Sequence, residues 1–136
     1  MSKKLYELII SIRKKCLRNE ENVRTELNLT PAEFQSLLVI EPEEKILGHI
    51  FSQRMCLSPS RGSRVISRLM KDGFVEQQIV PDNRRRAEIY LTTIGIQMRK
   101  QVVNRMEECE KKITSQLTRS QSKQVRETLE LLANIM

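Results

Sequence analysis

Residues 58–92 read SPSRGSRVISRLMKDGFVEQQIVPDNRRRAEIYLT, and this stretch decides the fold. Ser58 is a good helix cap, Pro59 suits the first helical position, and Asp72-Gly73 is a helix stop. Two β-prone segments follow, at 74–80 and 87–92, with Pro-Asp-Asn as turn chemistry between them. The stretch therefore predicts one helix followed by a two-stranded hairpin.

The predicted helix has one apolar stripe and one basic face. The stripe consists of Val65, Ile66, Leu69 and Met70. The outward face holds Arg61, Arg64 and Arg68 at i, i+3 and i+7, with serines between them. Arginine can pair bidentately with guanine edges, and serine hydroxyls can reach phosphates or bases. Ordinary soluble helix faces mix charges of both signs, whereas this face has an acidic residue only at its end, Asp72.

The predicted hairpin has three consecutive arginines, Arg84, Arg85 and Arg86, at the tip that joins its strands. Such arginines suit the narrow minor groove of DNA, where the negative potential is enhanced. From Ser58 to Arg86 there are seven cations against three anions, an excess of four in a chain whose net charge is +7. Charge is therefore concentrated in the helix and hairpin, which favours duplex DNA as the partner over a merely solvated surface.

The first helix is predicted over about residues 3–18, because its apolar residues recur at helical spacing. They are Leu5, Leu8, Ile9, Ile12 and Cys16. So apolar a stripe must pack either on its own domain or against a second chain. The next helix starts at Thr30-Pro31, with Glu33 completing a capping box, and should end before Pro42.

The remaining elements are predicted as a very short strand at 45–47 and helices at about 48–55, 92–117 and 120–136. The last helix carries Val125, Leu129, Leu132 and Ile135 on one face. The order is typical of an α+β, mostly α, winged helix-turn-helix with long terminal helices. We expect one domain over residues 1–136.

Composition excludes several other classes. Tryptophan is absent and aromatic residues make up 4% of the 136 residues, which argues against a stacking platform for single strands. No apolar run is long enough to span a bilayer or to form a signal peptide core, so a cytoplasmic protein is expected. No phosphate loop, nucleophile elbow or paired carboxylates indicate an enzyme, and no cofactor is expected. His49 is expected to be an ordinary helix-surface residue, and the Cys/His spacing matches no zinc site.

Three separated cysteines make a disulfide framework improbable. Cys16 is expected to be a buried structural residue on the first helix, and acidic neighbours at 107–110 should suppress the reactivity of Cys109. Cys56 follows Arg54 by two residues and precedes a helix, so it is the best candidate for a redox-sensing thiol.

The sequence resembles the multiple antibiotic resistance regulator (MarR) family of winged helix-turn-helix transcription factors. The resemblance covers about residues 29–95 and rests on LTPAEF, LSPSRGSRVISRLMKDGFV and NRRRAEIYLTTIG. The last segment matches the family's D-x-R-x-x-x-x-x-L-T-x-x-G pattern. The resemblance implies a homodimer whose first and last helices, residues 1–28 and 96–136, interlock. It also implies recognition helices in successive major grooves, a wing arginine at Arg85 with Arg84 beside it, and release by small ligands, phenolic compounds, oxidants or metals.

The sequence departs from the family pattern at four positions. Asn83 stands where aspartate is usual, and Gln77 stands where arginine is common. Cys56 occupies a position where glycine is frequent, which predicts a strained turn. Gly62 replaces an apolar residue and predicts a closer helix approach.

The sequence as a whole predicts a dimeric regulator, a repressor, that binds a pseudo-palindromic duplex operator and is released by an unidentified signal. Two alternatives are a winged-helix protein-interaction module without DNA binding and a thiol-sensing regulator that uses Cys56. The predicted DNA contacts are Ser58, Ser60, Arg61, Ser63, Arg64, Ser67, Arg68, Lys71, Arg84, Arg85 and Arg86. The predicted dimer contacts are Leu5, Leu8, Ile9, Ile12, Val125, Leu129, Leu132 and Ile135.

Overall fold

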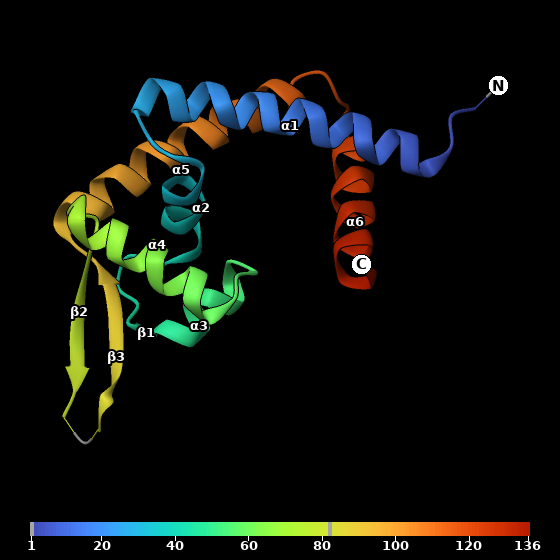
Figure 1. The fold of residues 1–136 in the computed structure, drawn as a ribbon. Coiled ribbons are helices and arrows are strands. Elements are labelled where there is room, and N and C mark those ends of the chain that lie inside the picture. Colours follow the sequence, from blue (N-terminus) through green and yellow to red (C-terminus); the bar gives the residue numbers. More distant parts are fainter. Residues whose placement is uncertain (1, 82) are drawn as a thin grey trace. The chain divides into compact units, whose positions relative to one another are not determined.

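The computed structural model describes residues 2–81 and 83–136, and for residues 83–85 it describes the backbone alone. The elements follow one another as α1 (Leu5–Leu27), α2 (Pro31–Val39), β1 (Ile46–Leu47), α3 (Gly48–Arg54), α4 (Pro59–Lys71), β2 (Val75–Val80), β3 (Asn83–Leu91), α5 (Thr93–Thr114) and α6 (Arg119–Ile135) (Figure 1). This order confirms the predicted α+β, mostly helical, winged-helix class.

The chain forms two compact units, 1–103 and 104–136. The first unit contains α1 to β3 and the first half of α5. The second contains the end of α5 and all of α6, where Arg126 lies 3.6 Å from Glu110. The expected single domain, with a 29–95 core between two dimerisation segments, stays a prediction. Among the described helices, none is both long enough and apolar enough to cross a membrane.

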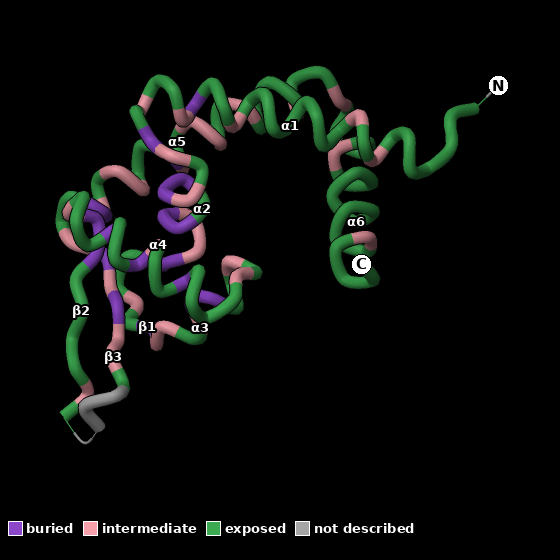
Figure 2. The backbone as a smooth tube through the Cα atoms, viewed as in Figure 1, coloured by how far each residue is buried: buried purple, intermediate pink, exposed green. Residues whose placement is uncertain are grey.

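The core of the first unit lies where α2, α3, α4 and the sheet meet. Its fully enclosed side chains include Leu37, Ile40, Phe51, Leu69 and Ile89. Figure 2 shows that the residues coloured as buried gather in these elements. Burying side chains of this size stabilises each element by roughly 1.5–3 kcal/mol per residue. The helix-turn-helix therefore has a fixed platform.

The capping signals lie where the sequence places them. Glu33 donates its backbone N–H to Thr30 Oγ1 at 3.1 Å, and Thr30 donates its N–H to Glu33 Oε1 at 3.0 Å. Ser58 Oγ accepts from the N–H of Arg61 at 3.3 Å. These bonds satisfy N–H groups that a helix leaves without partners, so they fix where α2 and α4 begin.

The first helix is longer than predicted, since it runs to Leu27 and not to about residue 18. The apolar stripe lapses after Cys16, but Arg18, Glu20 and Glu21 are good helix formers, and Val23 is buried about two turns further on. The helix ends at Asn28, which takes the left-handed conformation with φ 56°. Asparagine is the residue that tolerates this conformation best after glycine.

The three strands form an antiparallel sheet in the order β1-β3-β2. Ile46 pairs with Ile89, and Val75 pairs with Leu91, which ties the base of the hairpin to the core. At the far end Val80 pairs with Asn83, with a register shift between Ile79 and Val80. Residues 84–86 are therefore part of β3 and not of the turn. The predicted strand began at Ala87, because consecutive arginines are not β-prone by themselves. In the structure β3 begins at Asn83, which pairs with Val80, and residues 84–86 lie in the irregularity between this pair and the pair of Ile79 with Ala87.

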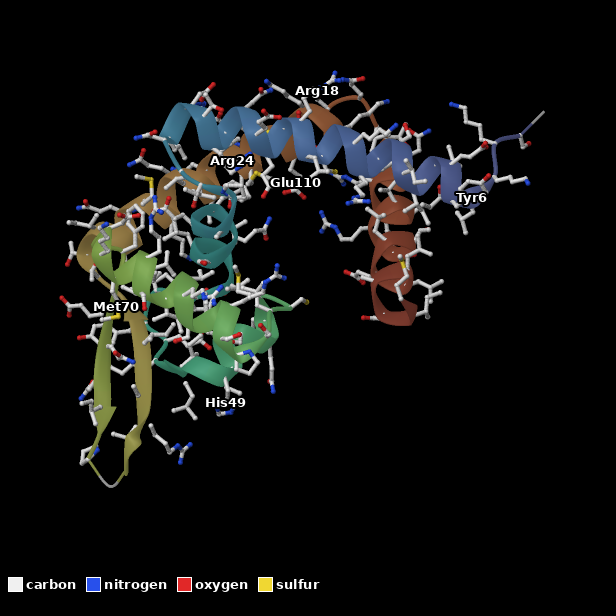
Figure 3. All side chains as sticks on the ribbon, in the orientation of Figure 1. Tyr6, Arg18, Arg24, His49, Met70 and Glu110 are labelled. Atoms are coloured by element: carbon white, nitrogen blue, oxygen red, sulfur yellow. The ribbon has the colours of Figure 1, made fainter. Side chains whose placement is uncertain are left out.

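Two predictions about buried side chains are wrong. Met70 is 40% exposed, because at the end of α4 it faces the surface beside the wing and not the core (Figure 3). The buried face of α4 consists instead of Gly62, Ile66 and Leu69. The prediction that Cys16 is buried is the second, because its side chain is exposed.

Candidate nucleic-acid interface

Helix α4, the predicted recognition helix, presents a basic face to the surface. Gly62, Ile66 and Leu69 are buried on one side. The predicted contacts on the other side are all exposed: Ser58, Ser60, Arg61, Ser63, Arg64, Ser67, Arg68 and Lys71. Their accessibility is therefore as predicted, while the DNA contact itself stays a prediction.

Gly62 lets α4 approach α3 closely. A Cβ atom at this position would overlap Ser52 Oγ and lie 2.8 Å from Ser52 Cβ. No other amino acid fits without a shift of one helix. Gly62 therefore replaces a large apolar contact with a short distance between backbones, as the sequence predicts.

The turn between α3 and α4 carries backbone strain. Cys56 has φ 56°, a left-handed conformation that costs an L-residue about 1–2 kcal/mol. The N–H of the next residue, Leu57, bonds to the carbonyl of Ser52 at 2.9 Å and holds the turn closed. This confirms the prediction of a strained turn at a position where glycine is frequent.

The basic face is partly neutralised only at its end. Arg68 Nε lies 3.3 Å from Asp72 Oδ2. Hydrogen bonding with Glu33, followed by the Arg68 guanidinium, holds the pKa of Asp72 below its usual range. Among the described side chains Arg61 and Arg64 take part in no ion pair, so their charges are available to a ligand.

The base of the wing is locked by the L-T-x-x-G part of the motif. Thr92 Oγ1 donates to the carbonyl of Gly73 at 2.5 Å and accepts from the N–H of Gly95 at 3.0 Å. A Cβ atom at Gly95 would overlap the carbonyl oxygen of Phe74. One threonine and one glycine thus join the start of β2 to the start of α5, and they fix the direction in which the hairpin leaves the core.

Side-chain contacts also brace the wing across all three strands. Lys45 Nζ donates to Gln78 Oε1 at 2.8 Å and lies 5.4 Å from the centroid of the Tyr90 ring. Tyr90 donates its hydroxyl hydrogen to Glu76 Oε2 at 2.8 Å, and this bond raises the pKa of Tyr90. Arg86 is exposed near the far end of the hairpin. The predicted contacts Arg84 and Arg85 have side chains outside the described residues.

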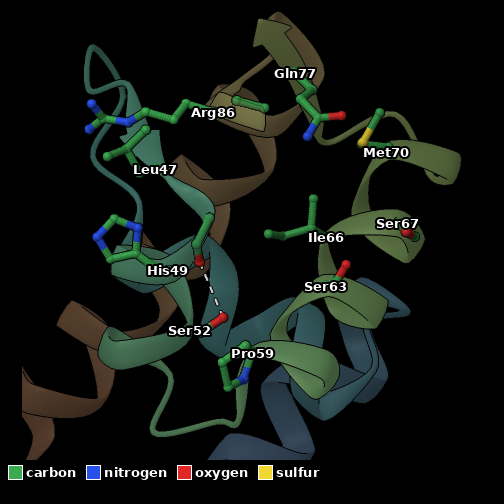
Figure 4. A pocket seen from close by; sticks show the side chains of 12 residues that line it. Leu47, His49, Ser52, Pro59, Ser63, Ile66, Ser67, Met70, Gln77 and Arg86 are labelled. Carbon is green, nitrogen blue, oxygen red and sulfur yellow. Dashed lines mark hydrogen bonds between the residues drawn. The ribbon is translucent and has the colours of Figure 1, made fainter. Parts of the chain in front are cut away.

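A cleft of about 440 Å³ separates α4 from the wing (Figure 4). Ser63 and Ser67 line it from α4, Gln77 and Arg86 line it from the wing, and His49 lines it from α3. The sequence reading missed His49 and Gln77 as members of one site. No local signal marks them, because only the packing of α3 and the wing against α4 brings them together.

Two arginines hold the segment after α2. Arg99 of α5 donates to the carbonyls of Leu37 and Leu38 at 2.8 and 3.1 Å. Arg54 of α3 donates to the carbonyl of Val39 at 2.9 Å and grips both carboxylate oxygens of Glu44. The hydrogen bond from Arg54 lowers the pKa of Glu44 to about 2. Through these hydrogen bonds the end of α2 and the segment after it are linked to both α5 and α3.

The cysteines differ in accessibility. Cys56 is exposed, as a thiol sensor requires, and Cys109 is half-buried. The redox role of Cys56 stays a prediction.

The predicted dimer contacts lie largely uncovered. On α1, Leu5, Leu8 and Ile12 are exposed and Ile9 is half-buried. On α6, which buries none of its residues, Val125, Leu129 and Ile135 are exposed and Leu132 is half-buried. On each of these two helices most of the predicted dimer contacts are therefore exposed apolar side chains.

No protein-family model and no curated protein matches the sequence, but solved structures match nearly the whole chain. MarR from E. coli in its apo form is 22% identical, with a TM-score of 0.80 over 97% of this chain and 98% of that one. The transcriptional regulator PA4135 is 19% identical, with a TM-score of 0.79 over 99% of both chains. A mutant of E. coli MarR complexed with operator DNA is 22% identical, with a TM-score of 0.78 over 94% of this chain and 92% of that one. These matches are to regulators and not to enzymes.

Proposed function

The chain has the winged-helix fold of the MarR family, and from that premise we propose that it is a transcriptional repressor that binds duplex DNA as a homodimer. The protein would act in the cytoplasm, and a signal yet to be identified would release it from its operator. The observation that carries the proposal is the exposed basic face of α4, which lies opposite the buried face formed by Gly62, Ile66 and Leu69.

The dimensions of α4 suit the major groove of B-DNA, which admits one α-helix. With Gly62, Ile66 and Leu69 against the core, Arg64 lies near the middle of the outward face. Its guanidinium would read a base edge, while Ser60, Ser67 and Lys71 would reach the flanking phosphates. Phosphate contacts fix the register of such a helix, and base contacts supply specificity.

The wing supports the same proposal. It extends from the core on a base fixed by Thr92 and Gly95, with Arg86 exposed near its far end. Arginines inserted in a narrow minor groove experience an enhanced negative potential. We assign this role to Arg85, with Arg84 and Arg86 beside it.

The uncovered apolar faces of α1 and α6 support a dimer. Leaving Leu5, Ile12, Leu129 and Ile135 in water forfeits roughly 25 cal/mol for each Å² of apolar surface that a partner would cover. A second copy of the chain would supply the cover. Because a two-fold dimer presents two equal recognition helices, its operator would be pseudo-palindromic.

Arg64→Ala tests the base-reading role. The variant should bind the preferred operator more weakly by roughly 1–3 kcal/mol and discriminate less between bases at one position of each half-site. Fluorescence anisotropy with the operator and with single-base variants measures both effects. Lys14→Ala on α1 removes one exposed cation from another element and serves as the matched control.

Arg85→Ala tests the wing. It should weaken binding to all duplexes and reduce the slope of log affinity against log salt by about 1. Affinities that do not depend on salt, in parent and variant alike, would contradict the proposal. Absence of duplex binding even at low salt would instead favour a protein-interaction module.

A further inference from the structure

The cleft between α4 and the wing is chemically suited to an anion. Its lining includes apolar side chains, among them Leu47 and Ile66, together with hydroxyl, amide, guanidinium and imidazole groups. None of its described lining residues is acidic. By contrast, the recess at residues 41–44 contains three glutamates, and the one at the base of the wing contains Glu76.

The position of the cleft identifies its occupant, given the proposed function on which this step rests. If α4 enters a major groove and the wing enters the adjacent minor groove, one sugar-phosphate strand separates the two elements. That strand must cross the space between Ser63 and Ser67 on one side and Gln77 and Arg86 on the other. A phosphodiester would there meet two hydroxyls, an amide and a guanidinium.

His49 is a further polar residue that lines this cleft. It is exposed, and it makes no hydrogen bond with any other described residue. Figure 4 shows His49 and Arg86 on opposite sides of Leu47, along the same wall of the cleft. It is also the single histidine of the chain. Histidine is the side chain whose charge ordinarily changes between pH 5 and 8, so a difference in pH response between the parent and a His49 variant reports on this residue.

Among the described residues that line the cleft, Arg86 is the one charged side chain besides His49. Arg86 faces the cleft from β3, and Glu88 stands opposite Leu47 in the β1–β3 ladder. Lys45, on the other side of β1, is already bonded to Gln78. A phosphodiester between His49 and Arg86 would therefore be the anion that favours the protonated imidazole.

We propose that the cleft between α4 and the wing binds the phosphodiester strand that separates the two grooves, and that protonated His49 adds a cationic contact to it. Affinity for duplex DNA then rises as the pH falls through the range in which the imidazole gains its proton. The proton is taken up on binding. Each added phosphate contact steepens the salt dependence of binding by about 0.9 in log-log slope.

The test compares the full-length protein with His49→Gln and His49→Lys, by fluorescence anisotropy on one fixed duplex at about pH 5.5 and about pH 7.5. The parent should bind about 3- to 10-fold more tightly at the lower pH, with a salt slope steeper by about 0.9. His49→Gln should lose both differences. His49→Lys should bind at the higher pH as the parent does at the lower pH, because its charge is permanent.

A second histidine supplies the matched control. Gln101→His, placed at an exposed position of α5 in the His49→Gln background, should not restore the pH response. A response restored by this variant would show that charge anywhere suffices, and would overturn the role of the cleft. Equal pH responses in the parent and His49→Gln would overturn it as well.

Free phosphate is the other source of the same chemistry. The ring resonances of His49, followed by NMR, should shift when duplex is added and stay unchanged with millimolar inorganic phosphate. Equal shifts with phosphate alone would overturn the assignment to the DNA strand. These outcomes are distinguishable from failure of the proposed function: in that case no variant binds duplex at low salt, whereas failure of the inference leaves salt-dependent binding without a response to His49.

Discussion

Gly62 and Cys56 show how single residues set the position of α4, the proposed recognition helix. Gly62 allows α4 to touch the backbone of α3 at Ser52, and Cys56 takes a left-handed turn between the two helices. Both positions depart from the family pattern, and in each case the departure has a physical consequence. The first brings the helices closer together, and the second places strain in the segment that joins them.

Gly62→Ala should destabilise the protein by roughly 1–3 kcal/mol, although alanine is otherwise the better helix former. The added Cβ overlaps Ser52 Oγ, and the helices must separate to admit it. The free energy of unfolding from urea titrations measures the effect.

Ser52→Gly removes the atoms that the new methyl group would meet. In the double variant it should therefore recover part of the stability lost in Gly62→Ala, giving a coupling of about 0.5–3 kcal/mol in a double-mutant cycle. Strictly additive effects of the two substitutions would mean that the close approach does not exist.

At the scale of elements, the end of α2 and the segment that follows it are held by side-chain hydrogen bonds from two other helices. Arg99 reaches it from α5, and Arg54 reaches it from α3. Together they satisfy carbonyl groups at the end of α2, where a helix otherwise leaves them without partners.

The ion pair of Glu44 with Arg54 predicts a pH dependence of stability. The carboxyl pKa falls from its usual 4.5 to about 2 in the folded protein. The stabilisation is therefore fully present above pH 4.5 and is lost as the pH falls toward 2. Glu44→Gln should be less stable than the parent at neutral pH, and the difference should vanish near pH 2.

Equilibrium unfolding of parent and variant across this pH range checks the prediction. Glu43→Gln is the matched control, since Glu43 is an exposed neighbour whose carboxylate takes part in no ion pair among the described residues. A constant difference between parent and Glu44→Gln at all pH values would contradict the assignment.

At the scale of the whole molecule, capping and stop signals predicted most of the fold. Thr30, Ser58 and Gly73 mark boundaries that are set by local hydrogen bonds or by backbone conformation, and these can be read from the sequence. The end of α1 and the start of β3 were missed. The former depends on helix formers without an apolar stripe, and the latter on pairing with β2.

The site was predictable in part for the same reason. The basic face of α4 follows from helical spacing within one element, so its residues were all placed correctly at the surface. The cleft was not predictable, because His49, Ser67 and Gln77 come from three elements that only tertiary packing brings together. Met70 was assigned to the core because spacing cannot distinguish the edge of a buried stripe from its middle.

Selection of bound sites from a pool of random duplex DNA tests the central claim most directly, because it examines binding, symmetry and spacing together. We expect an enriched inverted repeat whose half-sites are centred about one helical turn, roughly 10 base pairs, apart. Arg64→Ala should relax the preference at one position of each half-site. A pool that shows no enrichment, or one that converges on a single unsymmetrical site, would contradict the claim of a dimeric, sequence-reading DNA-binding protein.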